Sequence, residues 1–377
     1  MKEIKFNIPL HYPKSIKNIV DFLKTKKPLH GPNKNIFLIK ENIKKKLGFK
    51  NIHLTNSCTS ALEICALTLN LKSTDEVIVP SFSFITTGSS FARTGCKLKY
   101  CDITRKNLMP SFDQIKKCVN KKTKAIIILH YQGYSVDYLD KLQKFCKQKK
   151  IHLIEDAAQA YGSYFKNKPL GSFGDFACFS FHETKNLHSG VGGMLVVNNK
   201  KFVEKSYFVF DKGTDRHLVQ RGKQKYYSWV TMGSSFLLSE LVASYLLPQI
   251  INYKNIFETR KKLYNRYAFN FKKWLGDEFT LTNNYKYVYN FHSFVIVLKN
   301  NERESFFKYL KKFNINAVIS YVPLHKSIAG KVYKKNNDNL TNTNNLEKKI
   351  IRLPLHNYLS LKDIDLVCEK IKKYFKK

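Results

Sequence analysis

Short β-branched runs alternate with helical patterns between about residues 52 and 200, and this alternation limits the possible folds more than any other feature. Within and between these runs, apolar side chains recur at helical spacing over 61–69 and 139–146. Strands that alternate with helices form a mostly parallel sheet with helices on both faces. The sequence therefore predicts an α/β domain built on strands at 52–54, 77–79, 97–103, 125–129, 152–155 and 193–197.

The pattern changes after about residue 250, where long basic helices begin. A strand is predicted at 291–298, a helix at 305–313 and another strand at 316–321. The Asn-rich stretch 336–345 is expected to form an exposed loop. We therefore expect two domains, a large α/β domain over residues 1–250 and a smaller α+β domain over 251–377.

A last helix is predicted near the C-terminus. Ile364, Val367 and Ile371 fall on one helical face. Ser360 and Asp363 precede that face at the spacing of a capping box, although Glu or Gln is preferred at the third position of the box.

The formal net charge of +38 comes from 66 Lys and Arg against 28 Asp and Glu. Most of the basic residues are lysines that are scattered over nearly every predicted element, whereas nucleic-acid recognition draws on arginine and on a localised stripe. We therefore expect solvated lysine faces and no specific nucleic-acid partner, although the charge can help attract a diphosphate-bearing substrate.

The eight cysteines contain no Cys-x-x-Cys pair, which favours reduced core cysteines and argues against a metal site. The N-terminus has no apolar leader, and the longest strongly apolar stretch, 125–129, is too short to span a bilayer. The expected location is cytoplasmic, with no membrane partner.

Two segments carry candidate chemistry, one around Asp156 and one around Lys185. An acid at the end of an apolar strand, followed by a serine and then by a lysine in a Gly-rich turn, is what pyridoxal phosphate (PLP) chemistry requires. The lysine bonds to the cofactor and moves protons, while the carboxylate keeps the pyridine nitrogen protonated. Each residue alone has a simpler reading, as one more surface lysine or as a helix cap.

Further residues fit a cofactor site. Free N–H groups at the start of the helix after 52–54, with the hydroxyls of Thr59 and Ser60, can hold a phosphate, and Ser180 can add another hydroxyl. Phe84 follows the next strand and can stack on the cofactor ring, and Gln159 lies one turn beyond Asp156. An ordinary N-cap and simple core packing are the alternatives for Thr59 and Phe84.

The Glu155–Gln159 and Ser180–Asn186 segments resemble the DegT-type family of sugar-nucleotide aminotransferases, which have the PLP-dependent fold type I architecture, and the resemblance extends over nearly the whole chain. It implies a homodimer with active sites shared across the interface, and L-glutamate as amino donor to a nucleotide-linked keto sugar. Segments 181–186, 211–216, 233–236 and 321–325 resemble most the dTDP-4-amino-4,6-dideoxygalactose transaminases. The implied reaction converts dTDP-4-keto-6-deoxyglucose into dTDP-4-amino-4,6-dideoxygalactose, within lipopolysaccharide or other envelope polysaccharide biosynthesis.

The resemblance also implies which residues contact the substrate, and it shows where this sequence differs from the family's usual residues. Lys212, Tyr321 and His325 are implied near the substrate, with a surface or packing role as the alternative for each. The family's usual Gly-Glu-Gly-Gly segment has Val191 in place of the acid. Relatives place an interface-crossing Asn near Leu237, and Ser235 is the candidate replacement here.

Other functions are weighed against this one. Related sugar dehydratases carry His at the position of Lys185, so the lysine favours transamination. Transamination at C3 or of a UDP sugar, and a non-catalytic PLP-binding paralogue suggested by Val191, stay open. A dehydrogenase is disfavoured because no Gly-x-Gly-x-x-Gly follows the first strand.

Overall fold

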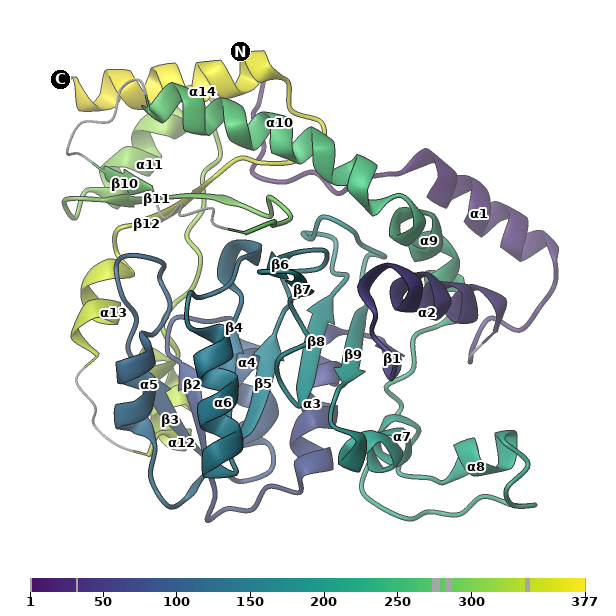
Figure 1. Ribbon diagram of the computed structural model, residues 1–377. Helices are drawn as coiled ribbons and strands as arrows, with labels where there is room; N and C mark the ends of the chain where they lie inside the picture. The colour runs from purple at the N-terminus through teal and green to yellow at the C-terminus, as the bar shows by residue number, and fades with distance from the viewer. Residues whose placement is uncertain (1, 32, 273–278, 282–286, 336–339, 377) are drawn as a thin grey trace.

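A computed structural model describes residues 2–31, 33–272, 279–281, 287–335 and 340–376. Its centre is a sheet of seven strands (Figure 1), in the order β1-β9-β8-β5-β4-β2-β3. The strands are β1 Ile52–Thr55, β9 Gly193–Val197, β8 Phe176–Ser180, β5 His152–Asp156, β4 Thr123–Leu129, β2 Glu76–Pro80 and β3 Lys97–Cys101. The sheet is mostly parallel, as predicted, because only β9 runs antiparallel to its two neighbours.

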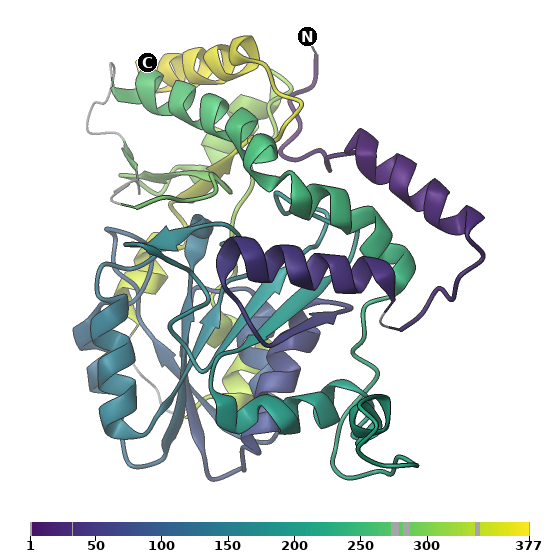
Figure 2. The same ribbon diagram turned by 45° about the vertical axis from the view of Figure 1, so that its right-hand side comes forward.

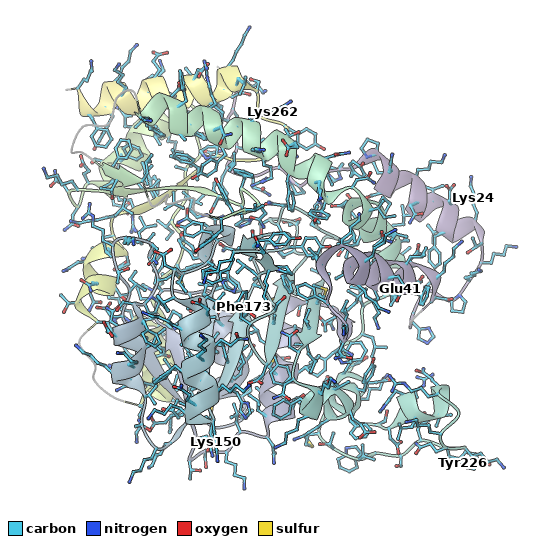
Figure 3. All side chains as sticks on the ribbon, viewed as in Figure 1. Lys24, Glu41, Lys150, Phe173, Tyr226 and Lys262 are labelled. Carbon is cyan, nitrogen blue, oxygen red and sulfur yellow. The ribbon has the colours of Figure 1, made fainter. Side chains whose placement is uncertain are left out.

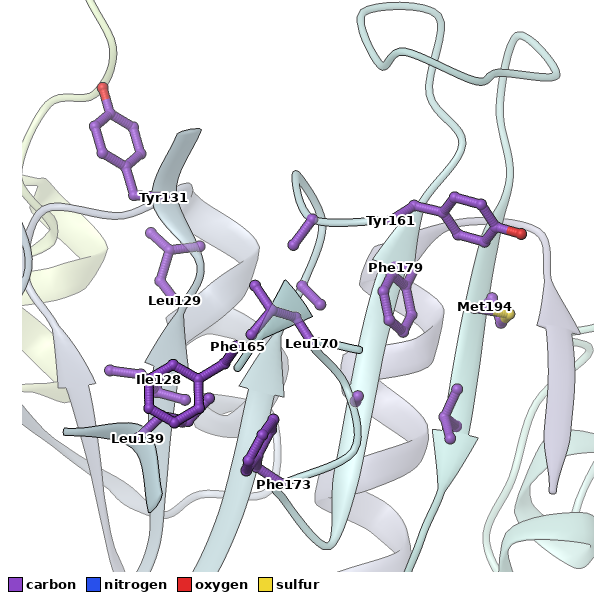
Figure 4. Packing of buried hydrophobic residues seen from close by; sticks show 14 of the residues in the cluster. Ile128, Leu129, Tyr131, Leu139, Tyr161, Phe165, Leu170, Phe173, Phe179 and Met194 are labelled. Carbon is purple, nitrogen blue, oxygen red and sulfur yellow. The ribbon is translucent and has the colours of Figure 1, made fainter. Parts of the chain in front are cut away.

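The sheet is buried on both faces, which explains why its strands read as continuous apolar runs. In β4, Ile126 and Ile128 belong to one apolar cluster, and Ala125 and Ile127 belong to the cluster on the opposite face. This split follows from the two-residue period of a strand. Figure 4 shows the first cluster, in which Phe179 of β8 packs with residues of neighbouring elements.

Helices cover both faces, as Figure 2 shows from a second side. The Ser57 side chain caps α3 by accepting a hydrogen bond from the Ser60 N–H. The helices of the large domain are α1 Pro13–Lys24, α2 Lys34–Leu47, α3 Cys58–Leu69, α4 Ile85–Ala92, α5 Phe112–Cys118, α6 Leu139–Lys149, α7 Val203–Phe210, α8 Arg216–Gln220 and α9 Glu240–Ile251. A short hairpin, β6 Tyr164–Phe165 and β7 Lys168–Pro169, follows β5.

A third apolar cluster, which belongs to the smaller domain, forms above the carboxyl edge of the large sheet. It is built on an antiparallel sheet, β10-β11-β12, and on long helices. Ile4 near the N-terminus also packs there and bridges to Ile315, so both chain ends lie in this part of the molecule (Figure 1). Its elements are α10 Tyr253–Lys272, β10 Phe279–Leu281, β11 Phe294–Leu298, α11 Arg303–Lys311, β12 Ile350–Leu353 and α14 Leu361–Phe375.

The predicted last helix is confirmed as α14, and its capping box is complete. The Ser360 hydroxyl accepts from the Asp363 N–H, and the Asp363 carboxylate accepts from the Ser360 N–H. A carboxylate at the third position can therefore replace the longer Glu or Gln.

Two predictions for the last third are wrong. Residues 316–321 form no strand and make a single bridge, between Val318 and Arg352. Residues 336–339 lie outside the described residues, but residues 341–345 of the expected Asn-rich loop belong to helix α13 Thr341–Leu346. The Asp102 carboxylate accepts bonds from the Asn342 and Thr343 N–H groups and so stabilises the start of that helix. Helix α12 Ile328–Tyr333 precedes it, and its last residues lead to a bridge between Leu98 and Lys334.

The lysines are dispersed, as expected from their sequence distribution. Lys24, Lys150 and Lys262 point outward from different parts of the molecule (Figure 3). None of the described helices is both long enough and apolar enough to cross a membrane.

Candidate active site

Several of the residues singled out in the sequence lie at the carboxyl edge of the large sheet. Asp156 ends β5 and Ser180 ends the neighbouring β8, and Asp156 lies opposite Cys178 in the register. Helices α3 and α4 begin at the same edge, after β1 and β2. Because the carboxyl ends of parallel strands share one edge, four segments far apart in sequence can build one site.

Asp156 is 2% exposed and is held by two hydrogen bonds. The Thr87 hydroxyl donates to Oδ2 at 2.6 Å, and the Ala158 N–H donates to Oδ1 at 3.2 Å. Burial raises the pKa of the Asp156 carboxyl, and these two donors partly oppose that rise. The carboxyl therefore has a fixed orientation and favours a cationic partner.

Thr87 was missed by the sequence analysis. It lies in the first turn of α4, three residues after Phe84, in the segment that follows β2. Because β2 is parallel to β5, the segment after β2 ends at the same edge as Asp156. The hydroxyl of Thr87, in the first turn of the helix that follows, could therefore have been predicted to lie near Asp156.

Lys185 lies in the turn between β8 and β9, and it is half-buried. Its N–H donates to the His182 carbonyl at 2.8 Å. Burial first, and then the positive charge of Arg352, lower the pKa of Lys185 from 10.5 to about 8, against the opposing effects of Cys58 and Asp156. An amine with this pKa is unprotonated far more often near neutral pH than an exposed lysine.

The start of α3 has the expected free N–H groups. Its hydroxyl groups, however, are not all available to a ligand. Ser57 is the N-cap, and its hydroxyl contacts that of Ser60 at 2.9 Å. The Ser60 hydroxyl also donates to the Asn56 side chain. Ser60 is therefore engaged within the cap, whereas Thr59 is half-buried in the first turn.

Gly193 lets the lysine-bearing loop lie directly against the start of α3. A Cβ atom at Gly193 would come within 2.3 Å of the Ser57 carbonyl carbon and 2.4 Å of the Cys58 nitrogen. A glycine is needed for this approach of two backbones. Val191, two residues earlier, is 59% exposed, so the departure from the family pattern lies on the loop surface.

Phe84, Gln159 and Tyr321 meet beside the site. The Gln159 amide donates to the Tyr321 hydroxyl at 2.7 Å, and its oxygen accepts from the Gln132 N–H at 2.7 Å. The Phe84 and Tyr321 rings meet edge to face, with centroids 6.3 Å apart. Phe84 is 55% exposed, which leaves its ring open to a ligand.

The other candidate substrate contacts have partners within the protein. His325 contacts the Ser81 hydroxyl through Nδ1 at 2.6 Å and the Asn344 side-chain oxygen through Nε2 at 3.0 Å. Lys212 is exposed and pairs with Asp211 at 2.7 Å. The Ser235 carbonyl accepts from the Asn56 side chain at 3.3 Å, which places Ser235 near the start of α3.

The smaller domain supplies residues that the sequence analysis did not assign to the site. Asn186, next to Lys185, donates to the Asn290 carbonyl at 2.6 Å, and its side-chain oxygen lies 3.1 Å from His292 Nδ1. Arg352 of β12 lies 3.4 Å from the other ring nitrogen of His292. These residues come from segments more than a hundred positions away from Lys185, and no local pattern marks them.

Comparison with known proteins agrees with this architecture. The DegT/DnrJ/EryC1/StrS aminotransferase family matches residues 11–372. The GDP-perosamine synthase of Escherichia coli O157:H7 is 25% identical over 319 residues, which cover 84% of each chain. Helicobacter pylori PseC, an aminotransferase involved in the biosynthesis of pseudoaminic acid, is 24% identical over the whole of both chains, with a TM-score of 0.90. The PLP form of Spr1654 from Streptococcus pneumoniae is 23% identical over 99% of this chain and 98% of that chain, with a TM-score of 0.88. The predicted fold type I architecture is thereby confirmed.

Proposed function

The chain belongs to the DegT/DnrJ/EryC1/StrS aminotransferase family and is a PLP-dependent transaminase, and from this premise we propose that it aminates C4 of a nucleotide-linked 4-keto-6-deoxy sugar. The proposed donor is L-glutamate, and the proposed reaction converts dTDP-4-keto-6-deoxyglucose into dTDP-4-amino-4,6-dideoxygalactose. The observation that carries the transaminase chemistry is a lysine with a pKa of about 8 near a buried, oriented carboxylate at the carboxyl edge of the sheet.

The described residues fit PLP. Asp156 would pair with the pyridine nitrogen, and its two fixed donors leave the carboxylate oriented for that bond. The N–H groups at the start of α3, Thr59 and Ser180 would hold the phosphate, with Ser60 and Ser235 at its periphery. Phe84 and Gln159 would flank the ring. When bound, PLP withdraws electrons from the carbon that bears the transferred amine.

Lys185 is proposed to move the proton. Its Nζ accepts a proton from the donor carbon and later returns a proton to the sugar carbon that receives the amine. With a pKa of about 8, about one amine in ten is unprotonated at pH 7. Asn186, the residue after the lysine, is anchored through its side chain to the Asn290 carbonyl and to His292.

The 4-keto position and the dTDP nucleotide rest on the sequence resemblance of segments 181–186, 211–216, 233–236 and 321–325. Tyr321 is the best supported of the candidate sugar contacts, because Gln159 holds its hydroxyl beside Phe84. For His325 and Lys212, which have partners within the protein, the role of substrate contact stays a prediction. The relative named GDP-perosamine synthase makes a GDP sugar the first alternative substrate to test.

We also propose a homodimer with shared sites. Figure 1 shows that α8 and the segment after it project from the body of the molecule. In that segment Tyr226 and Trp229 are each 75% exposed and Met232 is 68% exposed. Large apolar side chains gathered on a projecting arm typically bury against another chain. Light scattering would test the dimer, and Trp229→Lys should shift the population toward monomers.

The function is tested by the absorbance spectrum of the PLP-loaded protein before and after L-glutamate. The visible band of the lysine-bound cofactor should bleach, and keto-sugar nucleotides can then be screened for the one that restores it. Restoration by a 3-keto or UDP-linked sugar would replace the proposed substrate. A band that ignores L-glutamate and other amino donors would favour a non-catalytic PLP-binding paralogue, and Val191→Glu would then be the first variant to examine.

A further inference from the structure

A pocket lies at the edge of the large sheet opposite to the edge that holds the candidate active site. It has a volume of about 420 Å³ and is found where α6 ends and where β5 and β8 begin. Lys150, labelled in Figure 3, marks this edge. Asp156 and Ser180 end the same two strands, roughly 13 Å away at about 3.3 Å per residue. The pocket is therefore separated from the candidate active site by the length of the strands.

One face of α6 forms a side of this pocket. Gln143, Cys146 and Lys147 line it together with Lys150, which directly follows the helix, and their spacing of three and four residues is that of one helical face. Lys147 and Lys150 are exposed, and no ion pair or side-chain hydrogen bond joins either amine to a residue that the structure describes. Two ammonium groups without partners at one pocket favour an anionic ligand.

A second side of the pocket is held rigidly by hydrogen bonds. The Glu155 carboxylate accepts hydrogen bonds from three backbone N–H groups of the loop over 171–174. The Asn198 side chain donates to the Gly171 and Gly174 carbonyls of the same loop, at 2.8 Å each. Because Gly174 and Asn198 line the pocket, this side is already ordered before a ligand binds, which lowers the entropic cost of binding.

Asp175, a carboxylate that lines the pocket, is already engaged by the protein. Its Oδ2 lies 3.0 Å from His152 Nδ1 and accepts from the Leu153 N–H at 3.3 Å, while its Oδ1 accepts from the Asn199 side chain at 2.7 Å. Burial raises the pKa of Asp175, but the hydrogen bonds from His152 and Asn199 outweigh burial and hold the pKa below its usual value. These donors reduce the repulsion that the carboxylate exerts on a bound anion.

The remaining groups suit a ligand with an anionic part and an apolar part. His152 Nε2 and the Ser172 hydroxyl have no hydrogen-bond partner within the described part of the chain, and a third of the His152 side chain is exposed. Ile151, Leu153 and Phe173 also line the pocket and are buried. Pockets of about 300–1,000 Å³ that combine apolar residues with a few polar groups typically bind small organic molecules.

We propose that this pocket binds a nucleoside diphosphate at a site separate from the candidate active site. Lys147 and Lys150 hold the diphosphate through charge-assisted hydrogen bonds to its oxygens. The base lies along the apolar residues, and the sugar hydroxyls have Ser172 and His152 as partners. The positive charge of the whole chain favours the encounter with such a ligand.

Other anions use the same two cations but fit the pocket less well. An inorganic phosphate leaves the apolar residues without a partner. A nucleic acid needs a stripe of cations that follows many phosphates, whereas these two lysines flank a concave pocket. The inference is independent of the proposed transaminase function, because the pocket shares no lining residue with the candidate active site.

Calorimetry with dTDP on the PLP-loaded protein tests this site. The pocket variant, Lys147→Gln with Lys150→Gln, should bind one dTDP fewer per chain than its control, or bind it with a Kd raised about 10- to 100-fold. The control is Lys144→Gln with Lys149→Gln, which removes the same charge from exposed lysines of α6. Lys149, like Lys147, lies in the last turn of α6, where the helix dipole favours a cation, but it does not line the pocket.

Equal dTDP binding by the pocket variant and its control would overturn the proposal, whether both bind as the wild type does or both are weakened to the same extent. Pyrophosphate then separates a nucleotide site from a simple anion site. The part of its binding that the pocket variant loses should be at least about tenfold weaker than that of dTDP, because pyrophosphate leaves the apolar residues exposed. Equally tight binding would overturn the assignment of a nucleoside. Failure of the transaminase function looks different, because the wild-type spectrum would then ignore L-glutamate.

Discussion

Replacing Lys185 by methionine should stabilise the cofactor-free protein, although it removes the amine that we propose as catalytic. Its pKa falls from 10.5 to about 8 in the folded chain. That difference corresponds to at most about 3 kcal/mol at pH 7, where the charged amine pays for its burial beside Arg352. Methionine fills a similar volume without charge. We therefore expect Lys185→Met to unfold at higher urea concentration than the wild type.

The pH dependence has a definite sign. Below about pH 8 the amine is charged in both the folded and the unfolded chain, so the full cost of burial is present. Between pH 8 and about 10.5 the folded chain loses its proton first, so wild-type stability rises with pH. The advantage of Lys185→Met should therefore be largest below pH 8 and vanish above about pH 10.5.

Urea unfolding at pH 7, 9 and 10.5, at one fixed protein concentration, would measure this effect. The fixed concentration matters because a dimer links its stability to concentration. Lys262→Met removes an exposed lysine of α10 and serves as the control, with no change beyond about 0.5 kcal/mol. The reasoning would be refuted if Lys185→Met matched this control at pH 7, or if its effect did not depend on pH.

Three further substitutions test other parts of the site. Thr87→Val removes the 2.6 Å bond to Asp156, so the Kd for PLP, followed by absorbance, should rise by about tenfold. Gly193→Ala forces a Cβ into the start of α3 and should lower stability in urea by about 2 kcal/mol, whereas Gly192→Ala meets mainly a movable hydroxyl and should cost less. Glu155→Gln should lower stability by about 2–4 kcal/mol, because the carboxylate accepts three backbone N–H bonds; a PLP affinity that fell as far as for Thr87→Val would contradict this structural role.

Glu155 and Asp156 show how much of the site could be predicted from local sequence. Successive side chains of a strand point to opposite faces, so these two acids serve different ends. Glu155 is fully buried and contacts His130 at 2.8 Å. Its carboxylate also accepts a hydrogen bond from the Gly171 N–H and so holds the loop that contains Gly171. Asp156 faces the site. The sequence could predict the placement of Asp156 and Ser180, because parallel strands end at one edge, whereas the structural task of Glu155 depends on a loop that folds back.

The site residues contributed by the smaller domain could not be predicted in the same way. His292 and Arg352 reach Lys185 through the packing of one domain on another, and no periodic pattern encodes that distance. The errors at 316–321 and 341–345 have a similar origin. The carboxylate of Asp102 stabilises α13 from far along the chain, and this contact overrides the turn preference of its asparagines.

The site is divided by charge between the two parts of the molecule. The large sheet supplies the buried acid, Asp156, and the smaller domain supplies the cation Arg352. The two influences on the lysine have opposite sign, since Asp156 raises its pKa and Arg352 lowers it. Any movement of β12 relative to the large sheet would therefore change the pKa of Lys185, and with it the fraction of the amine that is unprotonated near neutral pH.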